Sequence, residues 1–274
     1  MTESPDGVLI IPDESPRAAM LVLSGSSGRI ATERVRLLAA HGIAAFAPRW
    51  FAGPGQPPGI CELPLESFTP MLDRLAELSP RLGIIGLSKG AEAALLLAAR
   101  DSRINVVVGL APTHVVWANV GAGVDGNDRP ERSSWTEAGR PLPFIPYDNN
   151  WSPPSEERPI AYRTMYAQSL RNFADRIPEA TIPVERIEGE VLLAAGGDDQ
   201  LWPSAVFAEL IVRRRAEHGL PTTFVTVPEA GHRAILPGEG QVTGGQPLAR
   251  GGNPKADVEL GALVWAELLA AFDT

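Results

Sequence analysis

The sequence contains a single cysteine, Cys61, and no apolar run of about 18 residues or more. One thiol cannot form an internal disulfide, and it cannot build a cysteine-based zinc site. The lack of a long apolar run excludes a membrane-spanning helix, and the polar, acidic start MTESPDG is unlike a secretory signal. We therefore expect a cytoplasmic protein that uses no membrane, no metal and no cofactor.

Positive charge is also scarce. The 24 Lys and Arg residues are outnumbered by 33 Asp and Glu residues, which gives a formal net charge of −9 at pH 7. The one basic run is Arg213-Arg214-Arg215. Nucleic acid is therefore excluded as a partner, since nucleic-acid-binding proteins carry a basic patch or stripe. We expect the three arginines on a solvated helix face, because charge along a helix usually faces water.

Short apolar runs alternate with segments of helical periodicity. The predicted strands are residues 7–12, 18–24, 43–48, 82–85, 105–110, 190–195 and 222–228. The predicted helices are residues 31–41, 65–78, a segment that begins at 89, 203–218 and 256–272. This alternation predicts one α/β domain over residues 1–274, with a mostly parallel sheet and helices on both faces.

The segment 82–100, LGIIGLSKGAEAALLLAAR, organises the chain. It predicts a buried strand, a tight turn and a helix, and the turn has the form G-x-S-x-G, with Ser88 at its centre. This is the nucleophile elbow of α/β-hydrolases, in which a strained turn exposes the serine at the start of a helix. Free backbone N–H groups there favour negative charge. A Gly-Ser turn without chemistry is the alternative.

A second loop of small residues, Ser24-Gly25-Ser26-Ser27-Gly28, follows the strand predicted at 18–24. A hydrolase places a backbone donor of its oxyanion hole in such a loop, because small side chains let the backbone approach a substrate carbonyl. We predict that the backbone N–H groups of Ser26 and Lys89 form the oxyanion hole. The alternative is a flexible turn.

An acid and a base complete the expected α/β-hydrolase order Ser, Asp, His. Asp199 lies in the loop after the strand at 190–195, and His232 follows the strand at 222–228. Ser88 would attack a carbonyl, His232 would move its proton, and Asp199 would orient the imidazole. Asp198 competes with Asp199 for the acid. His114 and His218 are weaker candidates for the base.

Residues 111–188 break the pattern. They are rich in Pro, Gly, Asn and Trp and have weak periodicity, which is typical of a lid or binding insertion. The segment leaves the sheet after one strand and returns before the strand that delivers Asp199. We therefore expect it to cover Ser88 and to line an acyl pocket with aromatic rings, Trp117 and Trp151 foremost, together with Trp135 and Tyr162. These rings could instead only anchor the insertion.

Four motifs, in order, resemble those of the acyl-CoA thioester hydrolase and bile acid-CoA:amino acid N-acyltransferase family. They are GLSKGAE in the elbow, TIPVERIEGEVLLAAGGDDQLWPS (181–204), EAGHRAILP (229–237) and GGNPKA (251–256). The resemblance covers the family's hydrolase domain, from about Ala18 to the C-terminus. It implies the nucleophile at Ser88, the acid at Asp199 and the base at His232.

The resemblance also bears on the reaction. Acyltransferases of that family use cysteine as the nucleophile, whereas this elbow carries serine, which favours hydrolysis through an acyl-enzyme. The primary hypothesis is a serine thioesterase acting on an acyl-CoA or on a carrier-bound acyl group. A carboxylesterase or lactonase similar to dienelactone hydrolases, an acyltransferase, and a non-catalytic protein that binds a small ligand beneath the lid are the alternatives.

Overall fold

A computed structural model describes residues 2–4, 6–126, 131–153, 158–240 and 246–273. Its main sheet has eight strands in the order β1-β2-β4-β3-β6-β7-β10-β11. These are β1 (Thr2–Ser4), β2 (Gly7–Ile10), β3 (Ala18–Leu23), β4 (Ile43–Pro48), β6 (Leu82–Leu87), β7 (Ile104–Leu110), β10 (Glu190–Gly196) and β11 (Thr223–Val227). From β4 to β11 every neighbouring pair is parallel, whereas β1 and β2 run antiparallel at one edge.

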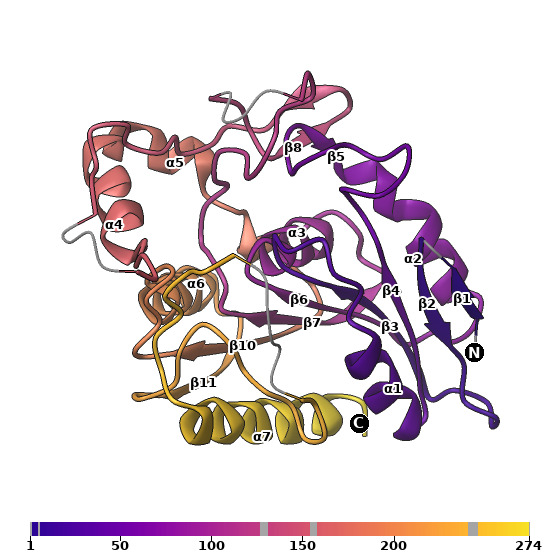
Figure 1. The fold of residues 1–274 in the computed structure, drawn as a ribbon. Coiled ribbons are helices and arrows are strands. Elements are labelled where there is room, and N and C mark those ends of the chain that lie inside the picture. Colours follow the sequence, from indigo (N-terminus) through magenta and orange to yellow (C-terminus); the bar gives the residue numbers. More distant parts are fainter. Residues whose placement is uncertain (1, 5, 127–130, 154–157, 241–245, 274) are drawn as a thin grey trace.

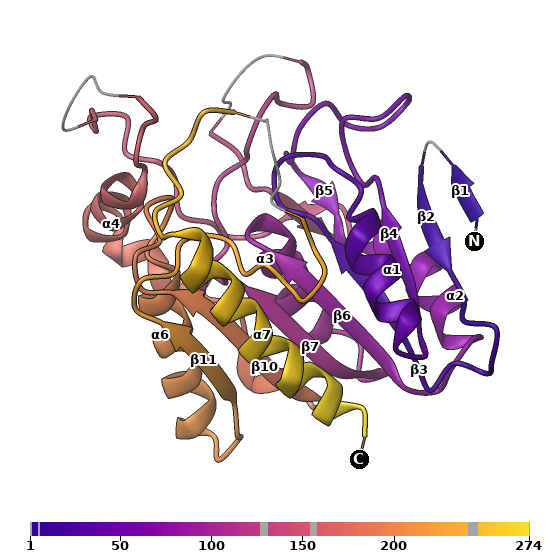
Figure 2. The ribbon, with the colours of Figure 1, turned by 60° about the horizontal axis from the view of Figure 1, so that its bottom comes forward.

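Helices cover both faces of this sheet (Figures 1 and 2). Helices α1 (Thr32–Ala40) and α7 (Pro254–Ala271) lie on one face, and α2 (Thr69–Ala76), α3 (Lys89–Ala98) and α6 (Ser204–Glu217) lie on the other. Strand β3 shows how the sequence builds two cores, because successive side chains of a strand point to opposite faces. Leu21 and Leu23 join the core under α2, α3 and α6, while Met20 and Val22 join the core under α1 and α7. The predicted α/β-hydrolase fold is confirmed.

The predicted element boundaries agree with the structure to within a few residues. Strand β4 spans the same six residues as predicted. The helix predicted at 65–78 begins as a 3₁₀ turn, η1 (Leu65–Phe68), and continues as α2. Helix α7 starts two residues earlier than predicted, because the side chain of Asn253 accepts a hydrogen bond from the Ala256 amide and caps the helix.

Residues 111–188 form an insertion between β7 and β10, of which 127–130 and 154–157 lie outside the described residues. It contains β8 (Trp135–Glu137), β9 (Arg140–Pro141), α4 (Arg163–Asn172), η2 (Ala174–Arg176), α5 (Ile177–Ala180) and η3 (Val184–Arg186). Strands β8 and β9 join β5 (Leu63–Pro64) in a small second sheet. Figure 1 shows the insertion above α3 and α6. The sequence pattern, which predicted an irregular segment, missed helix α4.

The expectation that the arginine run lies on a solvated face is wrong for Arg215. Its side chain is only 2% exposed, and it donates hydrogen bonds to the carbonyls of Val184, Ile187 and Pro221. A guanidinium can be buried in this way because carbonyl oxygens satisfy its N–H groups. Arg213 is exposed, and Arg214 pairs with Glu185 at 2.6 Å. In the described ranges, none of the helices has the length and apolar character that crossing a membrane requires.

Candidate active site

Ser88 lies at the junction of β6 and α3, in a backbone conformation that L-residues rarely adopt. Its φ and ψ angles are 57° and −117°. A non-glycine residue with positive φ is strained, and such strain is found at functional sites, where the surrounding structure holds it in place. Here the Ser88 amide donates to the carbonyl of Leu110 at 2.9 Å, which fixes the turn to the neighbouring strand β7.

The two glycines of the elbow are required by close backbone contacts. A Cβ atom on Gly86 would lie 2.1 Å from the carbonyl oxygen of Gly90, and a Cβ atom on Gly90 would lie 2.4 Å from the carbonyl oxygen of Ser24. Any larger residue at either position would push helix α3 away from the strands that support it. The spacing of the motif is therefore a consequence of how tightly the elbow packs.

Asp199 and His232 meet at the same edge of the sheet, after β10 and β11. Nδ1 of His232 lies 2.8 Å from Oδ2 of Asp199, and the two side chains are 5% and 0% exposed. The loop holds Asp199 through further bonds: the amides of Leu201 and Trp202 donate to Oδ1, and the hydroxyl of Ser204 donates to Oδ2. These donors satisfy a buried carboxylate and fix its orientation toward the imidazole.

The competing acid is held elsewhere. Asp198 accepts hydrogen bonds from the Gly252 amide at 2.8 Å and from Nε2 of Gln200 at 2.6 Å. These bonds lower the pKa of the Asp198 carboxyl, with the Gly252 amide as the largest cause. Asp198 therefore stabilises the loop that precedes α7, whereas Asp199 is the carboxylate that pairs with His232.

The two weaker histidine candidates lie away from this pair. His114 packs against Phe207 with a ring-centroid separation of 5.0 Å, and it is 8% exposed. Burial lowers its pKa to about 4, with Arg213 adding to the effect. His218 is exposed at the end of α6, with Nδ1 2.9 Å from the carbonyl oxygen of Arg214.

Ser88 and His232, both within the described ranges, form no hydrogen bond with each other in this structure. Such contacts are often long before substrate binds and tighten in the complex. The small-residue loop after β3 does reach the elbow, since a Cβ atom on Gly25 would lie 3.4 Å from Cβ of Ser88. The next amide, that of Ser26, and the Lys89 amide at the start of α3 donate no hydrogen bond to any other described residue.

The side chain of Lys89 takes part in a buried ion pair that sequence analysis missed. Its Nζ lies 2.6 Å from Oε2 of Glu92, and the two side chains are 2% and 0% exposed. Burial lowers the pKa of Lys89 and raises that of Glu92, and each partner opposes the effect of burial on the other. Oε1 of Glu92 also accepts from Nε1 of Trp135 and from the Trp117 amide. The helix that follows Ser88 is thus bonded directly to the insertion.

The insertion also contacts the loop that carries Asp199. Arg163, at the start of α4, donates from Nη1 to the carbonyl of Asp199, and Nε1 of Trp202 donates to the carbonyl of Ala111. The Trp202 ring lies edge-on to His232, with centroids 5.8 Å apart. The insertion therefore packs beside the carboxyl edge of the sheet, where Ser88 is only 6% exposed.

The two aromatic residues predicted to contact substrate are placed differently from each other. Trp117 is 0% exposed and packs against Tyr147, Tyr166 and Phe207, so its ring presents no surface to a cavity in this structure. The buried Trp117 ring therefore packs the interior of the insertion. Trp151 is partly exposed and contacts Tyr162 and Thr164. Among the described residues, no three His, Cys, Asp or Glu side chains come together as metal ligands.

Comparison with solved structures bears on the fold. Solved structures of similar fold include Est1E from Butyrivibrio proteoclasticus with bound ferulic acid (TM-score 0.56, 13% identity, 98% of this chain and 96% of that chain). Another is a dienelactone hydrolase-like promiscuous phosphotriesterase from metagenomic libraries (TM-score 0.50, 18% identity, 95% and 87%). The fold is that of the α/β-hydrolases.

The family follows from sequence. The family model described as BAAT / Acyl-CoA thioester hydrolase C terminal matches residues 66–273, and the chain belongs to this family. Acyl-coenzyme A thioesterase 6 of Homo sapiens is 26% identical over 280 residues, covering 95% of this chain and 61% of the relative. Acyl-coenzyme A amino acid N-acyltransferase 1 of Mus musculus is 25% identical, covering 97% and 62%. The chain spans less than two thirds of the length of these relatives.

Proposed function

We propose that the protein hydrolyses an acyl thioester through Ser88, His232 and Asp199. The observation that carries the proposal is the buried 2.8 Å contact between His232 and Asp199 at the sheet edge where the strained elbow presents Ser88. A nucleophile, a base and an orienting acid after three parallel strands are the parts that acyl transfer needs. Membership of the family, which includes acyl-CoA thioesterases, supports the thioester as the bond that is cleaved.

In the proposed mechanism, Oγ of Ser88 attacks the thioester carbonyl while Nε2 of His232 takes the hydroxyl proton. Asp199 accepts the Nδ1–H of the ring and stabilises the imidazolium that forms. The tetrahedral intermediate collapses, the C–S bond breaks, and His232 returns the proton to the leaving thiolate. Water then attacks the Ser88 ester, with His232 as base, and releases the carboxylic acid.

The developing oxyanion would be held by the backbone amides of Ser26 and Lys89. Both are available as donors, and the Lys89 amide is at the N-terminus of α3, where the helix dipole favours negative charge. The Lys89 side chain turns away to Glu92, so it contributes no free ammonium to the hole. Backbone donors need no reorganisation as the charge forms, which is the source of their catalytic effect.

We further propose that the insertion, residues 111–188, is the lid of this site. Its support is the pair of contacts to the two catalytic loops: Glu92 to Trp117 and Trp135, and Arg163 to Asp199. Trp202, which bridges the insertion and His232, would shield the imidazole from water. Of the two rings predicted to contact substrate, Trp151 keeps that candidate role, while Trp117 supports the lid from within.

The test is turnover of a panel of acyl-CoA thioesters against matched oxyesters, with and without an amino acid acceptor such as glycine. We expect thioester hydrolysis with a burst of acyl-enzyme, no amide product, and a loss of about 10⁴-fold or more in Ser88→Ala. Ser102→Ala, in an exposed turn, is the matched control. An acyl adduct that survives in Ser88→Ala would refute the nucleophile, and faster turnover of the oxyesters would identify an esterase instead.

A further inference from the structure

The first turn of α7 holds the loop that carries His232, the base loop (residues 229–235), at two points. The carboxylate of Asp257 accepts a hydrogen bond from the Gly231 amide at 2.7 Å. The backbone carbonyl of Asp257 accepts from the Ile235 amide at 3.0 Å. Gly231 directly precedes His232, and Ile235 lies shortly after it. A single residue of α7 is therefore bonded to the base loop on both sides of the imidazole.

The loop before α7 contacts the base more directly. The His232 amide donates to the carbonyl of Arg250 at 2.9 Å. The amide of Gln200, in the acid loop (residues 197–200), donates to the same carbonyl at 3.3 Å. One oxygen thus receives bonds from both loops that supply the pair of base and acid. Residues 250–257, here called the α7 segment, therefore lie against both loops.

A ring of hydrogen bonds joins these three parts of the chain. The Asp198 amide donates to the carbonyl of Ala230 at 3.0 Å, which connects the acid loop to the base loop. The Asp198 carboxylate accepts from the Gly252 amide at 2.8 Å, which connects the acid loop to the α7 segment. The bond from Gly231 to Asp257 completes the ring. Each part is therefore bonded to the other two.

The base loop also packs closely against α7 and the loop before it. A Cβ atom on Gly231 would lie 2.3 Å from the carbonyl oxygen of Gly251. A Cβ atom on Gly261, about one turn further along α7, would lie 1.7 Å from the carbonyl oxygen of Ile235. Backbones this close leave the base loop little room to shift. Its position is therefore determined by its contacts with α7.

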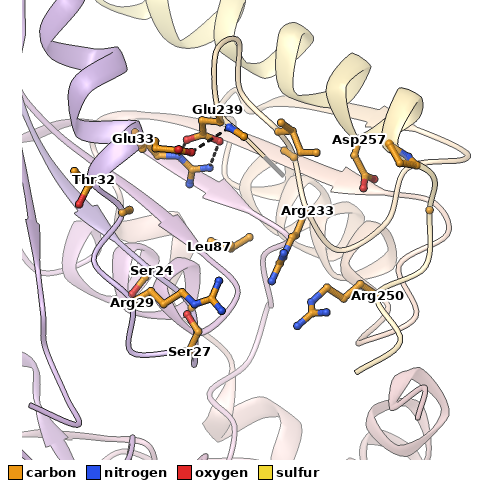
Figure 3. A pocket seen from close by; sticks show the side chains of 18 of the residues that line it. Ser24, Ser27, Arg29, Thr32, Glu33, Leu87, Arg233, Glu239, Arg250 and Asp257 are labelled. Carbon is orange, nitrogen blue, oxygen red and sulfur yellow. Dashed lines mark hydrogen bonds and ion pairs between the residues drawn. The ribbon is translucent and has the colours of Figure 1, made fainter. Parts of the chain in front are cut away.

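Asp257 is half-buried in the wall of a cavity of about 460 Å³ beside the elbow, and Figure 3 shows it at the start of α7. Leu87 and Arg233, the chain neighbours of Ser88 and His232, line the same cavity. Burial raises the pKa of the Asp257 carboxyl, and its backbone hydrogen bond and the charge of Arg233 oppose this effect. Asp257 thus lies beside the proposed catalytic residues, and its bonds to the base loop are made with the backbone.

We propose that Asp257 is a positioning residue, whose carboxylate holds the base loop so that His232 can reach Ser88. The proposal rests on the hydrolysis through these residues proposed above. A bond from a backbone amide to a carboxylate is charge-assisted, and it is stronger than a bond between neutral groups. Because a misplacement of about 1 Å can cost roughly 100-fold in rate, a bond at the residue before the base has a direct effect on catalysis.

The kinetic experiment compares two changes at position 257. Asp257→Ala removes the acceptor, whereas Asp257→Asn keeps an oxygen that can accept from Gly231. Glu259→Ala, exposed on the same helix, is the control and should keep the wild-type kcat. We expect Asp257→Ala to lower kcat for a thioester by roughly 10- to 100-fold with little change in KM, as for a misplaced catalytic group. Asp257→Asn should recover most of this loss.

Two results would overturn the positioning role. A change in KM alone in Asp257→Ala would make Asp257 a binding residue. An Asp257→Asn variant as slow as Asp257→Ala would show that the charge matters and the hydrogen bond does not. If Asp257→Ala does not fold, Asp257→Glu replaces it, because it keeps the charge and displaces the carboxylate by one methylene. Its kcat should then fall below that of Asp257→Asn, and an equal kcat would contradict the proposal.

A fluorophosphonate measures the same placement without a thioester. Oγ of Ser88 attacks phosphorus, fluoride leaves, and His232 takes the hydroxyl proton, so the labelling rate depends on the position of the base. We expect equal rates in the wild type and Glu259→Ala, and a rate roughly 10- to 100-fold lower in Asp257→Ala.

This labelling separates the positioning role from the proposed function. The expected rates in a protein that hydrolyses no thioester would support the role of Asp257 and refute the thioester as substrate. Equal rates in the wild type and Asp257→Ala would contradict the positioning role and leave the hydrolase intact. A wild-type protein that is not labelled at Ser88 would overturn both proposals.

Discussion

Nη1 of Arg163 donates to the backbone carbonyl of Asp199 at 2.7 Å, so the first residue of α4 holds the loop that presents the acid to His232. The same guanidinium reaches the carbonyl of Gly197 at 3.3 Å. A charged donor on two carbonyls of one tight loop fixes the backbone of that loop. The insertion thereby has a structural connection to the proposed catalytic pair, Asp199 and His232, in addition to its contacts with α3.

Arg163→Met tests this connection. The variant keeps an apolar stem and removes the donors, so the Asp199 loop should loosen and kcat should fall by roughly 10- to 100-fold, as expected for a misplaced catalytic group. KM should change little, because Arg163 is not expected to contact the acyl group. Arg171→Met, exposed on the same helix, is the control for steady-state kinetics. A change in KM alone would assign Arg163 to binding instead.

The choice between two adjacent carboxylates is tested by Asp199→Asn and Asp198→Asn. Asp199→Asn should lower kcat by about 10⁴-fold, because an amide no longer holds the imidazole in the productive tautomer. Asp198→Asn should lose far less, since its partners are the Gly252 amide and Gln200. Single-turnover acylation rates give the comparison, and equal losses would show that both carboxylates serve the base.

The buried pair of Lys89 and Glu92 predicts a double-mutant cycle. Lys89→Met leaves a buried carboxylate and Glu92→Gln leaves a buried ammonium, so each single change should lower the free energy of unfolding by about 3–5 kcal/mol. The double variant should recover most of this loss, because no buried charge remains and the Gln carbonyl still accepts from Trp135. Urea unfolding measures the cycle, and additive losses would mean that the pair is uncoupled.

His114 predicts an acid-sensitive stability. Its pKa is lowered from 6.5 to about 4 by burial, so between these values the unfolded chain binds a proton that the folded chain does not. Its contribution to stability is therefore complete above pH 6.5 and is lost as the pH falls toward 4. At pH 5 the loss attributable to this residue is about 2 kcal/mol. His114→Leu should flatten the unfolding free energy measured between pH 7.5 and 4.5, and parallel curves for both proteins would refute the assignment.

The sequence predicted the sheet well because parallel strands are buried on both faces. Such strands appear as uninterrupted apolar runs, as at β4 and β7, and glycine or proline marks where they end. The elbow could also be predicted. Close backbone contacts require glycine at positions 86 and 90, so the elbow has a recognisable sequence motif. Helix α4 could not be predicted, since many of its residues are polar and only Tyr166 and Ser169 are buried.

The sequence pattern gave no signal for side-chain contacts that form only when the chain folds. The sequence gives no sign that Lys89 is buried, whereas in the folded protein it pairs with Glu92, which also accepts from Trp117 and Trp135. Asp257 is 26 positions from Gly231, so neither residue predicts the bond between them. The sequence already favoured Asp199 over Asp198, but the side-chain directions that pair Asp199 with His232 are determined only in the folded loop.

The carboxylate of Glu92 couples the movement of the elbow helix α3 to that of the insertion. It is bonded at once to Lys89, whose amide is the candidate oxyanion donor, and to two separate points of the insertion. An acyl group that displaces the insertion would therefore also displace the amide that stabilises the oxyanion. We expect discrimination among acyl chain lengths to appear in kcat as well as in KM, so that a poorly fitting acyl group is processed slowly even when it saturates the protein.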